Sequence, residues 1–460
     1  VQAKTVSNNG GVITLDAGPN GLITVGSSSV GGKIDATGGT GVNGGTITLT
    51  ASSIDINAAS TLLANGGAAG TAIGGSTGGT INLLANPANS QSSMQIAGTL
   101  LADGGTNGGN GGTIDIQAYR LEQRMEASAR AKAASGLAGN INITSASIDV
   151  LGMTPLSLGD DKVAANVSLG FSFPYNGQNY TSVDVSSNGF LTFGTLRSPG
   201  FWYDTPLNSN STPRNSVFAL STDIIDLTNP YYTTIVLPDN SKRFILGYYG
   251  DREFNNSNIN SFEIVLDQNG RIQFNYGDLK ILNTNVTAGV TRTELTDFTQ
   301  LFRGTTNATT GLLDPGLLAG YANKSFEYNN GAFQSLSSVP MVPKGNTKIL
   351  ASQVETWLNS GTNVTLRAQN QTSATTGGTA TTLTPNEYLD VFVADGLSNR
   401  YKIFRSTSNA LVINTDSLNF SEVALSAYED DVDAFARWQI SNGYWGYKAG
   451  TREAFDGILD

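Results

Sequence analysis

The sequence contains no cysteine and no histidine among its 460 residues. Without these side chains, Ser-His-Asp and Cys-His catalysis are excluded, and so are ordinary zinc sites. Charge is also scarce, because charged residues make up 14% of the chain and the formal net charge is −11. A partner nucleic acid would require a Lys/Arg surface that displaces counterions, and the acidic balance argues against one.

Long apolar runs are missing as well. No run reaches the roughly 18 residues that a transmembrane helix needs, so we expect no membrane-spanning segment. The N-terminus lacks the charged start and apolar core of a signal peptide. A chain that begins at Val1 rather than Met is expected to be processed or a fragment. The lack of cysteine indicates no compartment, since many bacterial surface proteins avoid disulfides.

Glycine, by contrast, is abundant at 54 residues, and glycine pairs open a repeat. The phrase GG-x-I-x-L begins at Gly10, Gly44 and Gly78, with related phrases at Gly111 and, degraded to AGNINI, at Ala138. Apolar residues alternate inside each repeat, which is typical of short strands with fixed inward positions. One repeat cannot bury its apolar face alone, whereas stacked repeats bury a continuous column. The pattern predicts a right-handed parallel β-helix.

This predicted β-helix covers residues 1–150, with repeats of about 34 residues. The segment Tyr119–Ala133 has a helix-like composition, but its charged residues occupy every second position, which places them on one side of a strand. We therefore predict strand there. A disordered glycine-rich linker is the alternative for the whole region, although it would not keep apolar residues in register. The predicted inward column contains Ile47, Ile54, Leu62, Ile81 and Ile114.

The GG-x-I-x-I/L repeats and their A-S/N-GG corners resemble the filamentous haemagglutinin-like β-helices of bacterial exoproteins, particularly large cyanobacterial ones. The stretch Ile349–Asn370 is similar to a recurring element of those proteins, a short helix that leads into a strand. The resemblance implies secretion, an elongated rod, and adhesive or scaffolding work without catalysis. If Ile349–Asn370 resumes the repeat architecture, the segment before it is an insertion.

Between these two pieces, residues 151–336 have a different pattern. Many short alternating strands are separated by the turn signals Asn176-Gly177, Asn188-Gly189 and Asn269-Gly270, which predicts an antiparallel β-sandwich. The phrase FSFPYNGQNY…VSSNGFLTF resembles a sandwich module of bacterial secreted multidomain proteins, distantly like the extracellular domain of nidogens. This resemblance specifies a fold and leaves the ligand open.

The remaining chain is predicted to hold two smaller parts. Residues 337–384 comprise the helix–strand element and a Thr/Gly-rich linker, and residues 385–460 form a small α+β module. In that module we expect a helix over Ser421–Gly443, because apolar residues recur at spacings of three and four and Asn-Gly ends the segment. The predicted fold class is thus mainly β: a parallel β-helix, an antiparallel β-sandwich and an α+β C-terminal domain.

Four aspartates form the candidate metal site. They lie in or beside predicted loops of the sandwich, where carboxylates and carbonyls suit calcium. Aspartates in loops also cap turns, and the sequence has no DxDxDG pattern. Calcium is the one cofactor that the sequence suggests, and the residues are Asp160, Asp161, Asp223 and Asp226.

Aromatic clusters suggest glycan binding, because exposed rings stack on sugar faces. The best candidates are Phe201, Trp202 and Tyr203, which lie between predicted strands and beside prolines. The alternative, which we favour for the aromatic clusters as a whole, is that one ring of each pair faces the sandwich core and the other lies outside it, as for Tyr231-Tyr232 and Tyr248-Tyr249.

Three functions follow from these patterns. The first is a secreted, extracellular or cell-surface structural and adhesive protein that assembles head-to-tail with copies of itself into a fibre, sheath or surface layer. The second is a carbohydrate-binding adhesin that acts through the sandwich and has surface polysaccharide as its partner. The third, weaker alternative is a polysaccharide-cleaving enzyme, since some β-helices cleave polysaccharides with clustered acids. The acids in the repeats are sparse, so we expect no enzyme and name no catalytic residue.

Overall fold

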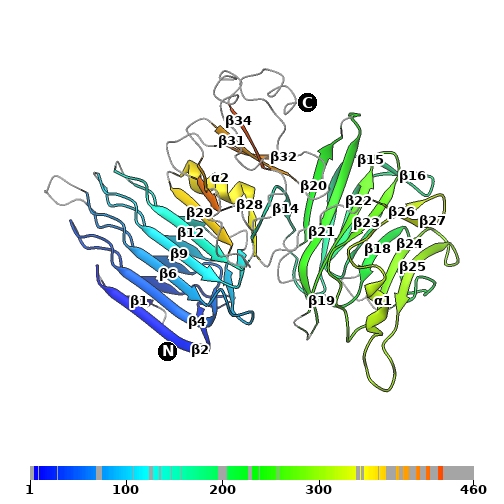
Figure 1. Ribbon diagram of the computed structural model, residues 1–460, viewed down its shortest axis with the longest axis horizontal. Coiled ribbons are helices and arrows are strands. Elements are labelled where there is room, and N and C mark those ends of the chain that lie inside the picture. Colours follow the sequence, from blue (N-terminus) through cyan, green and yellow to red (C-terminus); the bar gives the residue numbers. More distant parts are fainter. Residues whose placement is uncertain are drawn as a thin grey trace. The chain divides into compact units, whose positions relative to one another are not determined.

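The computed structural model of the chain divides into two compact units. The parallel unit contains Val1–Gly152, Gly345–Phe392 and Arg400–Asp460, and the inserted unit contains Met153–Lys344 together with the short segment Val393–Asn399. Figure 1 labels their strands and helices. The structure describes residues 5–368, except 9, 28, 69–74, 107, 124–127, 134–135, 147, 157, 195–204, 226–229, 238, 255, 257, 338–341, 343–346 and 361, together with five later strands, 380–382, 387–392, 400–404, 411–414 and 423–427.

One sheet of the parallel unit has five short strands: the first lies before the first GG-x-I-x-L phrase, and each of the first four repeats contributes one further strand. All its pairings are parallel, and each pair is in register. The strands follow one another in chain order: β1 (Thr5–Ser7), β3 (Lys33–Asp35), β5 (Thr61–Leu63), β8 (Thr99–Leu101) and β11 (Ser128–Arg130).

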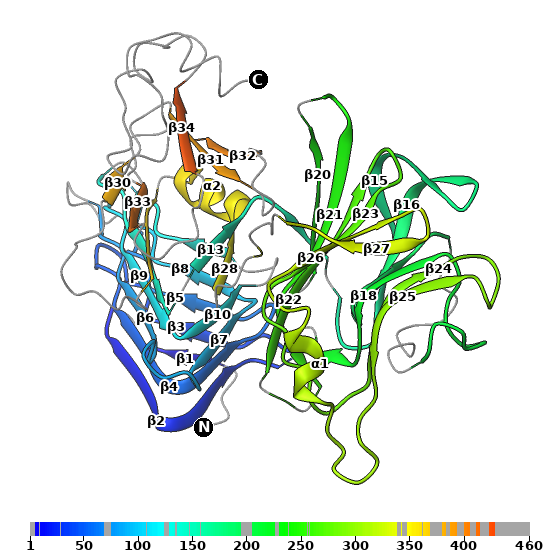
Figure 2. The same ribbon diagram turned by 45° about the vertical axis from the view of Figure 1, so that its right-hand side comes forward.

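The second sheet of this unit is larger and curls like half a barrel (Figure 2). Its long strands β2 (Val12–Val25) and β4 (Thr46–Ile56) bend, so that the two halves of β4 pair with different strands. The first half of β4 pairs with β6 (Thr80–Ala85). Beyond β6, the sheet goes on through β9 (Thr113–Ala118), β12 (Asn140–Ser145) and β29 (Asn363–Ala368), each paired with the strand before it. The second half of β4 pairs with β7 (Ser93–Ile96). Beyond β7, the sheet goes on through β10 (Arg120–Gln123), β28 (Thr347–Leu350) and β13 (Ile148–Leu151), each paired with the strand before it.

Aliphatic side chains stack in register through these parallel strands. One column runs through Ile13, Ile47, Ile81, Ile114, Ile141 and Val364. Residues of both parallel sheets belong to one apolar cluster, to which Ile34 and Leu62 contribute from the smaller sheet. The five residues expected to face inward are all buried in it: Ile47, Ile54, Leu62, Ile81 and Ile114.

Glycine pairs occupy the corners because neighbouring repeats approach closely there. A Cβ atom on Gly79 would lie 1.9 Å from the carbonyl oxygen of Gly45, and one on Gly67 would lie 1.7 Å from that of Gly39. No side chain fits at such distances. The recurring GG thus marks backbone-to-backbone contact between repeats.

The predicted strand in Tyr119–Ala133 is confirmed where the structure describes it, because β10 and β11 lie in this range. The charge of β11 meets an acid in the preceding repeat: Arg130 Nε donates to Asp103 Oδ2 at 2.8 Å. The other carboxylate oxygen of Asp103 accepts a hydrogen bond from the Lys132 amide, also at 2.8 Å.

After the inserted unit the chain returns to the larger parallel sheet. Strand β28 lies between β10 and β13, and α2 (Ala351–Asn359) and β29 follow it. The expected succession of a short helix and a strand in Ile349–Asn370 is therefore confirmed. Val354 and Trp357 of α2 are buried in the same aliphatic cluster.

The inserted unit consists of two antiparallel sheets that share a core. The first contains β14 (Thr154–Pro155), β20 (Tyr231–Val236), β21 (Lys242–Glu253), β22 (Ile259–Asp267), β23 (Ile272–Tyr276), β26 (Ser325–Asn329) and β27 (Ala332–Ser335), with β19 (Ile224–Ile225) paired to β21. The second contains β15 (Val163–Tyr175), β16 (Gln178–Ser186), β17 (Phe190–Thr192), β18 (Ser216–Ser221), β24 (Val286–Thr291) and β25 (Phe298–Gly304).

The two sheets share a core of aromatic side chains. Buried rings from both sheets form one cluster, which includes Phe173 of β15 and Phe262 of β22. A short helix, α1 (Pro315–Ala319), follows β25.

Turn signals in this unit are confirmed as turns. Asn176 and Gly177 both have positive φ, 50° and 74°. They connect β15 to β16 and lie between Tyr175 and Gln178, which form the last cross-strand pair before the turn. This is the backbone that a tight two-residue hairpin requires. Gly270 likewise has a positive φ in the turn between β22 and β23.

The C-terminal region corrects one prediction. Residues Val423–Ala427 form strand β34, which pairs with β31 (Glu387–Phe392); β32 (Arg400–Phe404) lies on the other side of β31. The helix predicted over Ser421–Gly443 is therefore wrong at its start, because cross-strand pairing with β31 outweighs the weak helical period of this short stretch. The rest of that range lies outside the described residues.

Two later strands join the parallel unit. Ala380–Thr382, within the predicted linker, forms β30, and β33 (Leu411–Asn414) pairs with both β30 and β29. The described chain is thus mainly β, with parallel and antiparallel sheets. No helix in its described part is long and apolar enough to cross a membrane.

Candidate metal centre

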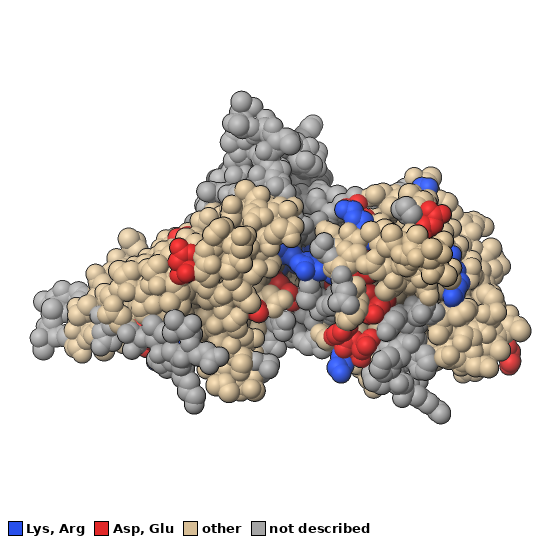
Figure 3. Space-filling view, turned by 90° about the horizontal axis from the view of Figure 1, so that it is seen from below, with Lys and Arg blue, Asp and Glu red and all other residues tan. Residues whose placement is uncertain are grey.

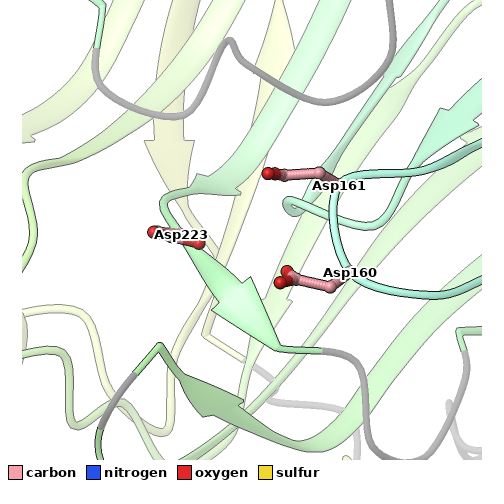
Figure 4. A group of neighbouring side chains, drawn as sticks. All are labelled: Asp160, Asp161 and Asp223. Atoms are coloured by element: carbon pink, nitrogen blue, oxygen red, sulfur yellow. The ribbon is translucent and has the colours of Figure 1, made fainter.

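Three of the four predicted metal-site aspartates come together in the inserted unit. Asp160 and Asp161 lie in the turn between β14 and β15, and Asp223 lies between β18 and β19. One carboxylate oxygen of each lies within 4.8 Å of the others. Figure 4 shows the carboxyl groups of Asp160 and Asp161 on the side of the turn that faces Asp223. The fourth residue, Asp226, lies outside the described residues.

Asn188 connects the two segments that carry these aspartates. Its Nδ2 donates to Asp161 Oδ1 at 2.8 Å, and its Oδ1 accepts from the Ile224 amide at 3.1 Å. Ser187 adds two hydrogen bonds to Lys162, the residue after the pair of aspartates. The sequence marked Asn188-Gly189 as a turn, but gave no sign that Asn188 would position a carboxylate.

Glu253 of β21 pairs with Ile224, the residue that follows Asp223. Its buried carboxylate accepts hydrogen bonds from three consecutive backbone amides, those of Leu282, Asn283 and Thr284. The next residue, Phe254, donates its amide to the Asp223 carbonyl at 2.9 Å. The loop positions are therefore set by the fold before any ion binds. Sequence reasoning missed Glu253, because one acid at a strand end has no pattern that distinguishes it.

The electrostatics of the site favour a bound cation. Burial raises the pKa of Asp223 to about 6, with further contributions from Asp161, Asp160 and Glu253. Burial and the neighbouring charge of Asp161 also raise the pKa of Asp160. Carboxylate repulsion of this kind is relieved by a proton or by a hard cation with oxygen ligands, such as Ca²⁺. Asp160 is exposed, so an ion could keep water ligands on that side.

The glycan candidates have a different outcome. Phe201, Trp202 and Tyr203 lie outside the described residues. The other tyrosine pairs pack internally: Tyr248 is buried in the core and its hydroxyl donates to the Ser186 carbonyl at 2.7 Å. Tyr231 stacks on the buried Tyr249 with ring centroids 6.0 Å apart.

Comparison with known proteins identifies one part of the chain. A family model described as NIDO related matches residues 141–314, a range that includes all three clustered aspartates. The chain is thus a β-rich protein that carries a NIDO-related domain, which agrees with the nidogen-like resemblance of this segment. No match was found among curated proteins or solved structures.

Proposed function

We propose that this chain is a non-catalytic structural and adhesive protein of the cell exterior, in which a parallel β-helix carries the NIDO-related domain. The observation that carries the proposal is the aliphatic column in register through six parallel strands, from Ile13 to Val364. Both parallel sheets contribute to one cluster, as two walls of a β-helix would. A stack of this kind supports a rod better than a catalytic cleft.

The surface chemistry supports the same proposal. Among the residues that Figure 3 colours, charged side chains occupy a smaller part of the face shown than the other residues do. Many outward positions of the larger parallel sheet are threonine or asparagine, as at Thr46, Thr80 and Thr113 in one row and Thr48 and Asn82 in the next. Such rows give a hydrated surface, and Asn82 Nδ2 donates to Thr48 Oγ1 at 3.3 Å along one of them.

The proposed assembly and localisation can be tested on the full chain. Light scattering after size exclusion and electron microscopy of concentrated protein should detect filaments or other self-assembled forms. Labelling of intact source cells with an antibody should place the chain on their surface. A chain that stays monomeric at high concentration would leave only the adhesive role, and binding on a glycan array would favour the carbohydrate-binding alternative.

We further propose that Asp160, Asp161 and Asp223 hold a calcium ion that stabilises the NIDO-related domain. Calcium should raise the unfolding temperature, a chelator should lower it, and Asp223→Asn should remove the response. The matched control is Glu294→Gln, an exposed acid in the same unit, which should respond as the original chain does. An equal calcium response in Asp223→Asn would exclude this site.

A further inference from the structure

The strand order at one edge of the larger parallel sheet departs from the chain order. Strand β13 does not pair with β10 of the preceding repeat, because β28 lies between them. Strand β28 reaches this place only after the whole inserted unit, which is compact and has its own core. The sheet thus contains a slot between β10 and β13 that a distant segment fills.

The strand in this slot, β28, carries a lysine at a position where both neighbouring strands carry an acid. Lys348 of β28 is in register with Glu122 of β10 on one side and with Asp149 of β13 on the other. Direct pairing of β10 with β13 at these positions would bring two acids together, and like charges on neighbouring strands are unfavourable. Glu122 and Lys348 are only 8% and 6% exposed, so solvent screens this charge row weakly.

Uncharged hydrogen bonds also hold the segment from β28 to β29 in its place in the sheet. The Thr347 hydroxyl accepts a hydrogen bond from the Leu121 amide at 2.9 Å and contacts the Ser145 hydroxyl. Further along, the Ala131 amide donates to Thr362 Oγ1 at 3.3 Å, and the Asn363 amide donates to the Gly139 carbonyl at 2.9 Å. With the buried side chains of α2, these contacts make residues 347–368 a strand–helix–strand module that adds two strands to the larger parallel sheet, β28 between β10 and β13 and β29 beside β12.

We propose that this slot also accepts the 347–368 module of a second copy, so that copies of the chain associate by exchanging it. The proposal rests on the self-assembly proposed above and names the surface that would carry it. The exchanged contacts are identical to those within one chain, which makes exchange a low-cost route to association. The charge of Lys348 supplies the selectivity.

A disulfide trap tests the exchange directly, because the chain has no cysteine of its own. Ser145→Cys on one tagged full-length chain and Thr347→Cys on a differently tagged one would be co-expressed and oxidised. The two hydroxyls are in contact in the folded chain, so a disulfide between two chains can form only if one chain's module occupies the other chain's slot. We expect a disulfide-linked mixed dimer. The mismatched pair Lys33→Cys with Thr347→Cys should give none.

A charge exchange provides the second measurement. Glu122→Lys and Lys348→Glu should each weaken association alone, whereas co-expression of the two chains should partly recover mixed-tag complexes, because opposite charges then meet at positions 122 and 348. The double variant in one chain should recover association to the same partial extent, since Asp149 still faces position 348 from β13. Mixed chains that neither crosslink nor co-purify, while the Ser145→Cys/Thr347→Cys chain closes its own disulfide, would overturn the exchange. If such chains still form filaments, the self-assembly proposal survives by another contact.

Discussion

At the scale of single residues, Ile81 is a sensitive position of the parallel unit. Its side chain has no solvent exposure, and it lies in register between Ile47 and Ile114. We expect Ile81→Asp to unfold several repeats, since a buried carboxylate without a partner costs far more than a lost methyl group. The control Ile81→Val should cost only about 0.5–1.5 kcal/mol. Circular dichroism during thermal unfolding measures both, and an unchanged melt in Ile81→Asp would contradict the buried column.

Asp223 should make the stability of the inserted unit depend on pH. Its pKa is raised from 3.8 to about 6, and that of Asp160 is raised as well. A raised acid pKa adds stability that is complete below the unfolded pKa and is lost as pH rises through the folded pKa. Without calcium, the unfolding temperature of this unit should therefore fall between about pH 4 and pH 6, in a way that Asp223→Asn weakens.

Calcium should compensate for that loss at neutral pH, where the carboxylates are charged and repel one another. Melting curves at pH 5 and pH 7.5, with calcium or with chelator, separate the two effects. If stability instead rises steadily from pH 4 to pH 7 without calcium, the clustered aspartates are not the dominant titrating groups of the unit.

At the scale of elements, β28 depends on the hydroxyl of Thr347. Thr347→Val keeps the shape of the side chain but removes the acceptor for the buried Leu121 amide. We expect a loss of about 1–3 kcal/mol in the unfolding free energy of the parallel unit, because a buried donor is left unsatisfied. Thr347→Ser retains the hydroxyl and should lose less. Denaturant unfolding measures the difference, and equal stabilities would mean that the hydroxyl contacts contribute little.

Local sequence patterns predicted where the strands lie along the chain better than they predicted which strands pair in the sheet. The GG-x-I-x-L phrase located the parallel strands and the inward Ile residues, because alternation and glycine corners are local signals. The position of β28 depends on Lys348, Glu122 and Asp149, which no short-range pattern links. The same reason applies to the candidate metal site: the loop aspartates could be predicted from the sequence, whereas the contacts of Asn188 and Glu253 depend on the tertiary structure.

At the scale of the whole molecule, the inserted unit should fold when expressed alone as residues 153–344, because it has its own two sheets and core. A shorter form that ends at residue 336, where the sequence suggested a boundary, should be less stable. It lacks Val342, which is buried beside Gly277. Limited proteolysis and thermal melting compare the two. A collapsed, protease-sensitive product from 153–344 would show that this unit depends on the rest of the chain.

The position of β28 in the chain also determines when the larger parallel sheet can complete its strand pairing during synthesis. Leu350 leaves the ribosome 199 residues after Leu151. At roughly 5–20 residues per second, β13 therefore waits about 10–40 s for β28, its only strand neighbour among the residues that the structure describes. The segment Met153–Lys344 of the inserted unit is synthesised within that interval, so it can fold before β28 is available to pair with β13. The nascent chain thus carries an open strand edge for much of its translation, and any factor that delays aggregation would act in that period.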